Sequence, residues 1–552
     1  MSAQGLGGTE RDVLAHEALQ QIPTILTLMD RNRHSPTYGC FDRNYWHYRI
    51  IDFPSGMAQE FVLPLALAYK LDIPGNPYYQ QASIKEWVEA GILYAATSAH
   101  FDGSCDDYFP FERAGGAAAF SLLACLDAYQ ITGLDNPSIL AFFEKRSDWL
   151  AGHQESGRLS NHQTLITLCL ELAGQTLGSD RWKISAADRL SQVLSWQTDE
   201  GWFWEYEGCD PGYLTLTISI LARIDQINPS PELTKALATA VAFAAHFIHP
   251  DGSFGGEYGS RNTYNFFPHG FELVGRTNPQ ALAINDLFLK GLCEGRGPCH
   301  ADDHIIGHHT WNYLLAWQDF IPNRPEPQDR EQGRTYFPIA KLLVERRGDM
   351  TLYVALNKGG VFKAFCGDTQ VCSDTQFSVQ TKGAFVRNAV GHLVDDYAPR
   401  FGDDEFTVEG PLGWAKQTRM TTVNLIGLRS VMYTVGRFFP NLIRRLLQRM
   451  LITGKKTAPY TFKRSFVWKG DALTVEDELH AETWDNVAEV ALGVDQTSIY
   501  VVMSRTFQAA QMQPWQDLTT EIQALKSGEG LKLCRQISHK KSIQLRPFLQ
   551  NL

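Results

Sequence analysis

The sequence lacks several features that would direct the chain to a membrane, an oxidising compartment or a nucleic acid. No apolar run approaches the roughly eighteen residues of a membrane-spanning helix. The amino-terminal segment carries charges and no apolar core of a secretory signal, which predicts a cytoplasmic protein. The ten cysteines are scattered from Cys40 to Cys534 without a CxxC pair, so no disulfide framework is expected. The net charge of −11 argues against general nucleic-acid binding.

What the chain does contain is a repeated unit in its first 320 residues. Each unit has a small or acidic residue, a glycine, aromatic and polar residues, and then an apolar helical stretch. The glycines are Gly103, Gly157, Gly201 and Gly252, which are spaced by 54, 44 and 51 residues. A period near fifty that holds two helices indicates stacked helical hairpins, because one hairpin cannot bury its own apolar face. The turns then gather on one face, and a closed ring of hairpins places them around a central cleft.

The turns are rich in Trp, Tyr, Asn, His and Glu, whereas turns without a function are usually Ser, Gly, Asp and Lys. Loops held on a rigid scaffold commonly carry function. Aromatic platforms beside polar groups suit sugar rings, which have apolar faces and hydroxyl rims.

A change of pattern divides the chain. The segment 321–335 contains three prolines and six charged residues, which is typical of a linker. Beyond it, stretches such as TLYVALNKGGVFKAF and SFVWKGDALTVEDEL alternate apolar and polar residues and predict strands. The predicted architecture is an α/α-toroid over 1–320, a linker over 321–335, and an antiparallel β-sandwich over 336–552 with a helical insertion at about 424–456.

The insertion contains a basic amphipathic helix. Between Glu409 and Asp471 there is no acidic residue, and twelve lysines or arginines occur. Within residues 441–451 six apolar side chains share one face and three arginines share the other. Two interpretations remain open. The helix packs on the sandwich with a solvated basic face, or residues 441–456 contact anionic lipid or anionic glycan, which would place the protein at the inner face of the membrane.

Two positions at the starts of neighbouring apolar helices are candidates for chemistry. Asn161 and His162 open the stretch HQTLITLCLELAG, where Ser160 or Asn161 is also a possible helix cap. Tyr213 follows Pro211 and Gly212 at the start of the next inner helix, where it could instead simply pack on its neighbour. Because the two positions are equivalent in adjacent hairpins, we expect them to face the same cleft.

With these motifs in place, the chain resembles the heparinase II/III-like and oligoalginate-type polysaccharide lyases. The resemblance rests on SNHQTLITLCLELAG, on EGWFWEYEGCDPGYLTLTISIL about fifty residues later, and on FKRSFVWKGDALTVEDEL in the β domain. It implies a toroid with an antiparallel β-sandwich and cleavage of uronic-acid glycosides by β-elimination. It also implies that Asn161 and His162 neutralise the uronate carboxylate and that Tyr213 donates or accepts a proton.

These residue types suit that reaction. The C5 proton of a uronate becomes acidic only when hydrogen bonds stabilise the enolate of the C6 carboxylate, and Asn and His supply such bonds. A phenol has a pKa of about 10, so tyrosine acts readily as an acid and acts as a base only beside positive charge. Arg261 is the expected carboxylate clamp, since arginine binds carboxylates in bidentate fashion.

Further turn residues are expected to line the cleft and contact substrate. They are Asn44, Trp46, His47, Glu112, Arg113, Trp202, Trp204, Glu205, Tyr206, Tyr258, Asn262, Tyr264, His269, His304 and His308. The spacing of His304 and His308 also occurs in metal sites, but no matching ligand set is visible, so neither a metal nor another cofactor is expected.

One departure from the resemblance concerns the β domain. The lyases carry a His-rich strand motif there, whereas KAFCGDTQVCSDTQFSVQTKG has no histidine and the nearest is His392. Three functions therefore stay open: a lyase acting on acidic polysaccharide or oligosaccharide, a uronate C5-epimerase, and a non-catalytic glycan-binding protein of polysaccharide assembly or export. The sequence does not define the oligomeric state.

Overall fold

The computed structural model describes most of the chain. The described residues are 10–298, 305–440, 456–493 and 515–537, without the single positions 156, 207, 328, 384, 417, 418, 524, 526 and 527, and with the addition of 442, 443 and 446. His304 and most of the predicted basic helix at 441–456 lie outside the described residues.

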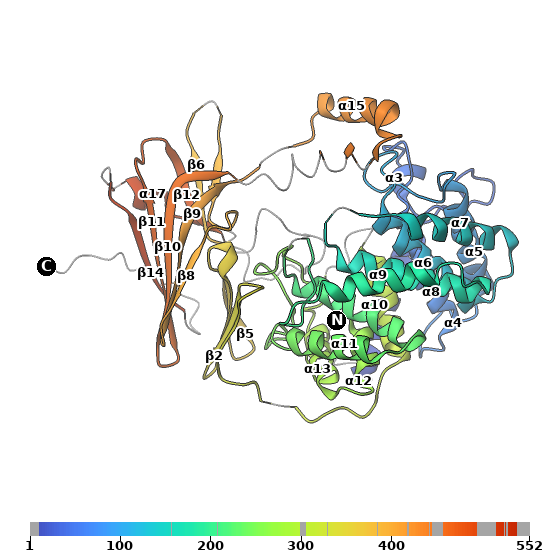
Figure 1. Ribbon diagram of the computed structural model, residues 1–552, viewed down its shortest axis with the longest axis horizontal. Coiled ribbons are helices and arrows are strands. Elements are labelled where there is room, and N and C mark those ends of the chain that lie inside the picture. The colour runs from blue at the N-terminus through green and yellow to red at the C-terminus, as the bar shows by residue number, and fades with distance from the viewer. Residues whose placement is uncertain are drawn as a thin grey trace.

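The first part of the chain folds into helical hairpins (Figure 1), and contacts between the inner helices close them into a ring. The helices are α1 (Glu10–Leu19), α2 (Ile22–Leu28), α3 (Arg43–Trp46), η2 (Met57–Phe61), α4 (Val62–Lys70), α5 (Ala82–Ser98), α6 (Gly115–Thr132), α7 (Pro137–Gly152), α8 (Ser160–Leu177), α9 (Lys183–Ser195), α10 (Pro211–Ile227), α11 (Pro231–Ala244), α12 (Pro268–Gly275), α13 (Pro279–Cys293) and α14 (Ile305–Gln318). Helices α4, α6, α8, α10, α12 and α14 each contact the next, and α14 contacts α4. This closure is the predicted toroid.

The repeated glycines have a common geometric role. Gly103, Gly157, Gly201 and Gly252 all have positive φ, between 80° and 99°. A Cβ on Gly103 would lie 2.8 Å from the backbone of Arg146 in α7, and one on Gly252 would lie 2.3 Å from the carbonyl oxygen of Leu287 in α13. Each of these two turns therefore needs glycine both for its conformation and for its close approach to an outer helix.

The second part of the chain consists of two antiparallel sheets. The strands are β1 (Gly333–Phe337), β2 (Leu342–Arg347), β3 (Met350–Ala355), β4 (Val361–Cys366), β5 (Thr369–Asp374), β6 (Phe377–Thr381), β7 (Asn388–Val390), β8 (Ala398–Phe401), β9 (Glu405–Trp414), β10 (Thr457–Lys469), β11 (Ala472–Ala481), β12 (Val487–Gly493), β13 (Trp515–Asp517) and β14 (Leu531–Ile537), with short helical turns η3 (Leu356–Lys358) and α17 (Thr519–Gln523). One sheet has the order β1-β2-β3-β4-β5. The other has the order β13-β12-β6-β7-β9-β10-β11-β14, with β8 on β9.

The five-stranded sheet lies between the toroid and the larger sheet, so the molecule has three layers (Figure 1). Alternate residues of β2 to β4 belong to two different cores: Tyr353 and Phe365 pack into the toroid core, whereas Val354 and Phe362 pack against the larger sheet. Phe362 meets Phe466 of β10 with ring centroids 5.2 Å apart. Both faces of this middle sheet are therefore buried, and the sheet joins the helical toroid to the larger sheet by continuous packing.

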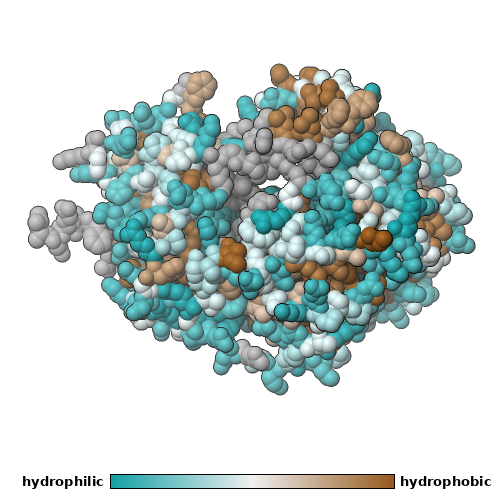
Figure 2. Space-filling model, viewed as in Figure 1, coloured by the Kyte–Doolittle hydropathy of each residue, from teal (hydrophilic) through white to brown (hydrophobic). Residues whose placement is uncertain are grey.

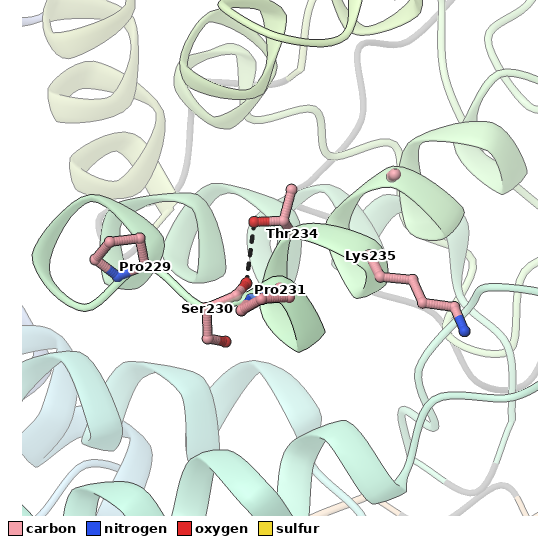
Figure 3. A pocket seen from close by; sticks show the side chains of 6 residues that line it. Pro229, Ser230, Pro231, Thr234 and Lys235 are labelled. Atoms are coloured by element: carbon pink, nitrogen blue, oxygen red, sulfur yellow. Dashed lines mark hydrogen bonds between the residues drawn. The ribbon is translucent and has the colours of Figure 1, made fainter.

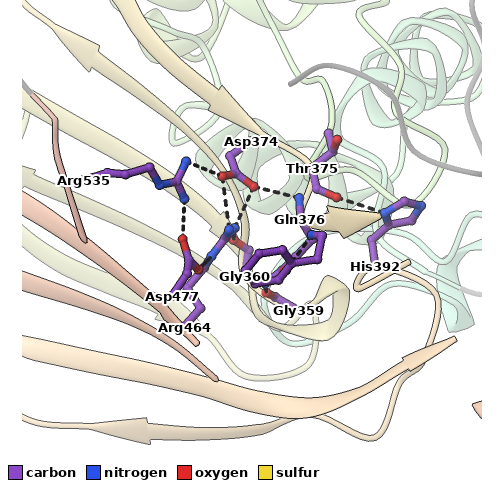
Figure 4. A network of polar contacts seen from close by, with 10 residues as sticks. Gly359, Gly360, Asp374, Thr375, Gln376, His392, Arg464, Asp477 and Arg535 are labelled. Atoms are coloured by element: carbon purple, nitrogen blue, oxygen red, sulfur yellow. Dashed lines mark hydrogen bonds and ion pairs between the residues drawn. The ribbon is translucent and has the colours of Figure 1, made fainter. Parts of the chain in front are cut away.

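Four charged side chains are buried between the two sheets (Figure 4). Arg464 of β10 donates to Asp374 of β5 at 2.8 Å, and Arg535 of β14 pairs with the same carboxylate at 2.7 Å. Both arginines also bind Asp477 of β11. Although burial raises the pKa of Asp374, the two arginines outweigh burial and hold it below its usual range. Two positive and two negative charges therefore compensate each other in the interior.

Between β9 and β10 the chain leaves the sheets and crosses to the toroid as α15 (Thr422–Val431) and the π-helical turn η4 (Met432–Gly436), above α3 in Figure 1. Arg429 pairs with Asp52 at 3.1 Å, and the Tyr433 hydroxyl donates to the same carboxylate at 3.0 Å. Among the described residues, no helix combines the length and the apolar character required to cross a bilayer. The nine cysteines that the structure describes are all free thiols.

Candidate functional site

The candidate site lies where the second, third and fourth turns meet the first residues of the inner helices. Helix α8 contacts α10, and α10 contacts α12, so their amino-terminal ends are neighbours. The turns are joined by short backbone bridges, including one between Leu159 and Glu205. This arrangement brings side chains from positions about fifty residues apart in the sequence into contact.

Asn161 has a different role from the helix cap that its position suggested. Helix α8 begins at Ser160 without a side-chain cap, and the Ser160 hydroxyl instead donates to the Trp204 carbonyl oxygen at 2.7 Å. The capping interpretation of Ser160 and Asn161 was therefore wrong, because both residues already lie within the first helical turn. Asn161 is 1% exposed, and its amide makes no well-formed hydrogen bond among the described residues, although it lies beside the Glu205 carboxyl and helps to lower the pKa of that group. A buried amide with such weak partners keeps hydrogen-bonding capacity for another contact.

His162 is held in one orientation by an acidic partner. Its Nδ1 lies 2.9 Å from Glu155 Oε2, in the turn that precedes α8. The ring lies over Gly116 at the start of α6, where a Cβ would approach its Cε1 atom to 2.7 Å. The glycine thus provides the space for the imidazole. The His162 side chain is 18% exposed, so it can be reached from outside.

Tyr213 and Arg261 are positioned by the same carboxylate. Asp210 caps α10 by accepting the Tyr213 N–H at 3.1 Å, and its other oxygen accepts the Arg261 N–H at 2.8 Å. The Thr263 hydroxyl also donates to Asp210. Asp210 was not among the predicted site residues, although an acidic residue directly before Pro-Gly at a helix start is a recognisable capping signal.

Tyr206 contacts both Tyr213 and Arg261. The Arg261 guanidinium stands 3.9 Å above the Tyr206 ring centre, and the Tyr213 ring centre is 5.8 Å away. Tyr206 has a φ of 51°, a left-handed conformation that is uncommon for a residue with a bulky side chain. The neighbouring Glu205 accepts the Asn161 N–H at 3.1 Å, which connects this stack to α8. We call this set the turn cluster; it consists of Asn161, His162, Glu205, Tyr206, Tyr213 and Arg261.

Burial controls the titration of the turn cluster. It raises the pKa of the Tyr213 phenol well above its ordinary value of 10, and nearby Arg261 offsets this only in part. Burial also raises the pKa of Glu205 to about 7, against the opposing effect of nearby His162. At neutral pH the phenol therefore keeps its proton, whereas the Glu205 carboxyl exists in both forms.

The middle sheet contributes charged groups to the fourth turn that the sequence analysis missed. Lys363 of β4 is 1% exposed and its Nζ lies 3.0 Å from Glu257 and 3.1 Å from the Tyr264 hydroxyl. Lys358 donates to the carbonyl oxygens of Glu257 and Gly259. A lysine inside the apolar strand VFKAFC was the available signal, because an isolated buried charge requires a partner.

Other predicted contact residues are placed differently. Trp202 is 1% exposed and donates its indole N–H to Glu200 at 2.7 Å, which in turn accepts N–H groups from the β domain. Tyr258 is equally buried, with its hydroxyl 2.7 Å from His249 Nε2. These two aromatic residues join the toroid to the middle sheet and have almost no surface to offer a ligand.

The remaining predicted residues divide between rim and interior. Asn44 and His47 are exposed at α3, and Trp46 donates its indole N–H to the Leu28 carbonyl oxygen. Trp204 carries the Arg158 guanidinium 3.6 Å above its ring. Four other residues have partners in the helical layer or in the first turn: Glu112 with the Tyr108 N–H, Arg113 with Asp102, His269 with Asp319, and His308 with Glu60. Asn262 is fully buried in the fourth turn.

No group of three or more His, Cys, Asp or Glu side chains suited to hold a metal occurs in the described part of the chain. A surface hollow lies at the far end of the α10–α11 hairpin, where Thr234 donates to the Ser230 carbonyl oxygen (Figure 3). It is about 24 Å along α10 from Tyr213 by helix rise, and Lys235 is the charged residue of its lining. It therefore belongs to another part of the surface than the turn cluster.

Comparison with known proteins gives a fold. No protein-family model matches the sequence, and no curated protein matches it. Among solved structures, the chondroitin AC lyase of Streptomyces coelicolor A3 in complex with chondroitin sulphate matches with a TM-score of 0.52 at 12% identity, over 88% of this chain and 68% of that chain. The two proteins share one fold.

A xanthan lyase of Paenibacillus is also similar, with a TM-score of 0.49 at 12% identity over 87% of this chain and 46% of that one. The present chain thus spans about half the length of that enzyme. A D-mannose isomerase matches 57% of this chain over its full length, with a TM-score of 0.41 and 12% identity. The fold class expected from the sequence, a toroid followed by an antiparallel β-sandwich, is confirmed, as is its likeness to the polysaccharide-lyase fold.

Proposed function

We propose that this protein acts on uronate-containing acidic polysaccharide and cleaves it by β-elimination. The single observation that carries the proposal is the turn cluster, in which Tyr213 and Arg261 share Asp210 and both contact Tyr206, while Asn161, next to His162, is bound by the neighbouring Glu205. The chondroitin AC lyase that shares the fold was solved with chondroitin sulphate, an acidic polysaccharide.

In this proposal the carboxylate of the sugar is held by Arg261 and Asn161. Arg261 supplies positive charge beside Tyr213, and the Asn161 amide makes no well-formed hydrogen bond among the described residues. Hydrogen bonds to the C6 carboxylate strengthen as negative charge moves onto it during removal of the C5 proton. Because Asn161 is buried, substrate reaches its amide only after the side chains that cover it move.

The proton acceptor is a group that is unprotonated near neutral pH and accessible. Imidazole is the commonest proton acceptor among side chains, and His162 is accessible and oriented by Glu155. Glu205 has a suitable pKa of about 7, but its carboxyl is buried. We therefore assign the base to His162.

Tyr213 is assigned the acid. Removal of the C5 proton by His162 leaves the electron pair to form the C4–C5 double bond, and the bond from C4 to the bridging oxygen breaks. That oxygen takes a proton from the Tyr213 hydroxyl. The raised pKa of Tyr213 favours this direction, because the phenol enters the reaction protonated.

The test is incubation with a panel of acidic polysaccharides, followed by ultraviolet absorbance of the new unsaturated uronate. Wild-type protein and a Tyr79→Phe control, which removes a hydroxyl outside the cluster, should both produce absorbance. Deuterium uptake at C5 without absorbance would instead identify an epimerase. Binding without either signal would leave a non-catalytic glycan-binding protein, and an inert protein would refute the proposal.

A further inference from the structure

The segment between β9 and β10 exposes an unusual amount of apolar surface. Helix α15 has no buried residue, and Val423 is 78% exposed. Further apolar side chains follow along η4 and the residues after it, and Figure 2 shows them as a brown area above the toroid. We call this the α15 surface; its exposed apolar members are Met420, Val423, Leu425, Ile426, Val431, Val435, Phe438, Phe439, Leu442 and Leu446.

The orientation of this surface is set by contacts on its other side. Arg429 and Tyr433 both bind Asp52, and the Tyr433 ring meets Phe111 edge to face at 5.3 Å. Met432 is buried, while residues before and after it point outward. The segment is therefore fixed to the toroid with its apolar side chains turned to the outside. Water-soluble monomers seldom expose contiguous apolar areas of this extent unless a partner covers them.

The charge of the segment identifies the kind of partner. No acidic residue occurs from position 410 to position 470, in a chain whose net charge is −11. Lys416, Arg419 and Arg437 are exposed within or beside the α15 surface. Aliphatic and phenylalanine side chains combined with cations and without acids are characteristic of helices that lie in the interface of an anionic membrane.

We propose that the α15 surface binds the face of an anionic lipid bilayer, with its apolar side chains among the acyl chains and its cations at the headgroups. The inference rests on described residues alone and stands apart from the proposed reaction, since none of its apolar members belongs to the turn cluster. The Tyr433–Phe111 contact places the bound membrane beside the first turn of the toroid.

The test is flotation with vesicles of phosphatidylglycerol and phosphatidylcholine in equal parts, and with vesicles of phosphatidylcholine alone. Wild-type protein should float with the anionic vesicles, and binding should weaken as salt is added. The variant Val423→Ser, Ile426→Ser, Phe438→Ser, Phe439→Ser should bind about tenfold or more weakly. The variant Lys416→Gln, Arg419→Gln, Arg437→Gln should lose about a hundredfold on anionic vesicles.

A matched control, Ile184→Ser with Phe385→Ser, removes two strongly exposed apolar side chains elsewhere and should float like wild type. All substituted side chains are exposed, so thermal unfolding should be unchanged and loss of binding will not reflect misfolding. Protein that never floats, or floats equally after the four serine substitutions, would overturn the proposal. So would a dimer, detected by light scattering, that those substitutions convert to monomer, because a second copy would then be the partner. Glycan turnover without flotation would refute only this inference, and flotation without turnover would refute only the proposed function.

Discussion

Replacement of Glu205 by glutamine should make the folded protein less sensitive to alkaline pH. Glu205 is buried beside Asn161, and its pKa is raised from 4.5 to about 7. A carboxyl whose pKa is higher in the folded state binds its proton more tightly there, so its contribution to stability falls as pH rises between these values. One pKa unit corresponds to about 1.4 kcal/mol, so ionised Glu205 destabilises the fold by about 3 kcal/mol above pH 7.

Glutamine can still accept the Asn161 N–H but cannot ionise. We expect the variant and the wild type to unfold at similar temperatures near about pH 4, and the variant to gain about 3 °C by about pH 8. Differential scanning fluorimetry across this pH range measures the difference in unfolding temperature between variant and wild type. Groups that titrate alike in both proteins do not affect this difference. Thr234→Ser, at an exposed position of α11 and without change to any ionisable group, should give a constant difference. A difference for Glu205→Gln that is likewise independent of pH would refute the reasoning.

The remaining predictions concern the reaction and the sandwich. Tyr213→Phe should lower kcat by about 10²–10⁴-fold with little change in glycan affinity, since it removes only the transferable proton; undiminished turnover would exclude Tyr213 as the acid. Asn161→Ala and His162→Ala should reduce kcat more than they raise KM, because Asn161 acts on charge that develops in the transition state and His162 accepts the C5 proton there. A fall in unfolding temperature with unchanged kcat would instead indicate a structural role for them. Asp374→Asn should destabilise the β domain by about 3–5 kcal/mol in urea unfolding, because it leaves buried arginines without full compensation; a stability equal to wild type would contradict this account of the network.

The architecture could be predicted because its signals are local and repeated. Gly103, Gly201 and Gly252 recur before apolar helices, and their positive φ values show why only glycine suits these turns. The start of α10 was equally predictable from the sequence, because Pro211 at the first helical position follows the capping residue Asp210. Such patterns lie within a few neighbouring residues and need no knowledge of the rest of the fold.

Which turn residues face a ligand could not be predicted in the same way. Trp202 and Trp204 are two positions apart in one aromatic turn, yet Trp202 is buried. Its indole N–H donates to Glu200, which also accepts the N–H groups of Ile339 and Ala340 in the β domain. Lys363 stands out as a charge in an apolar strand, but its partner Glu257 lies on the toroid, which covers that side of the sheet. In both cases the contact that determines burial is made with residues about one hundred or more positions away in the sequence. Local sequence patterns therefore do not predict it.

The middle sheet has a consequence for how this chain can be divided. Its residues complete the apolar interior of the helical ring on one side and that of the larger sheet on the other. A fragment that ends before β1 would expose to water the part of the ring's interior that the middle sheet covers. A fragment that begins at β1 would expose the face of the middle sheet that packs against the ring. The two halves are therefore expected to aggregate when they are expressed separately.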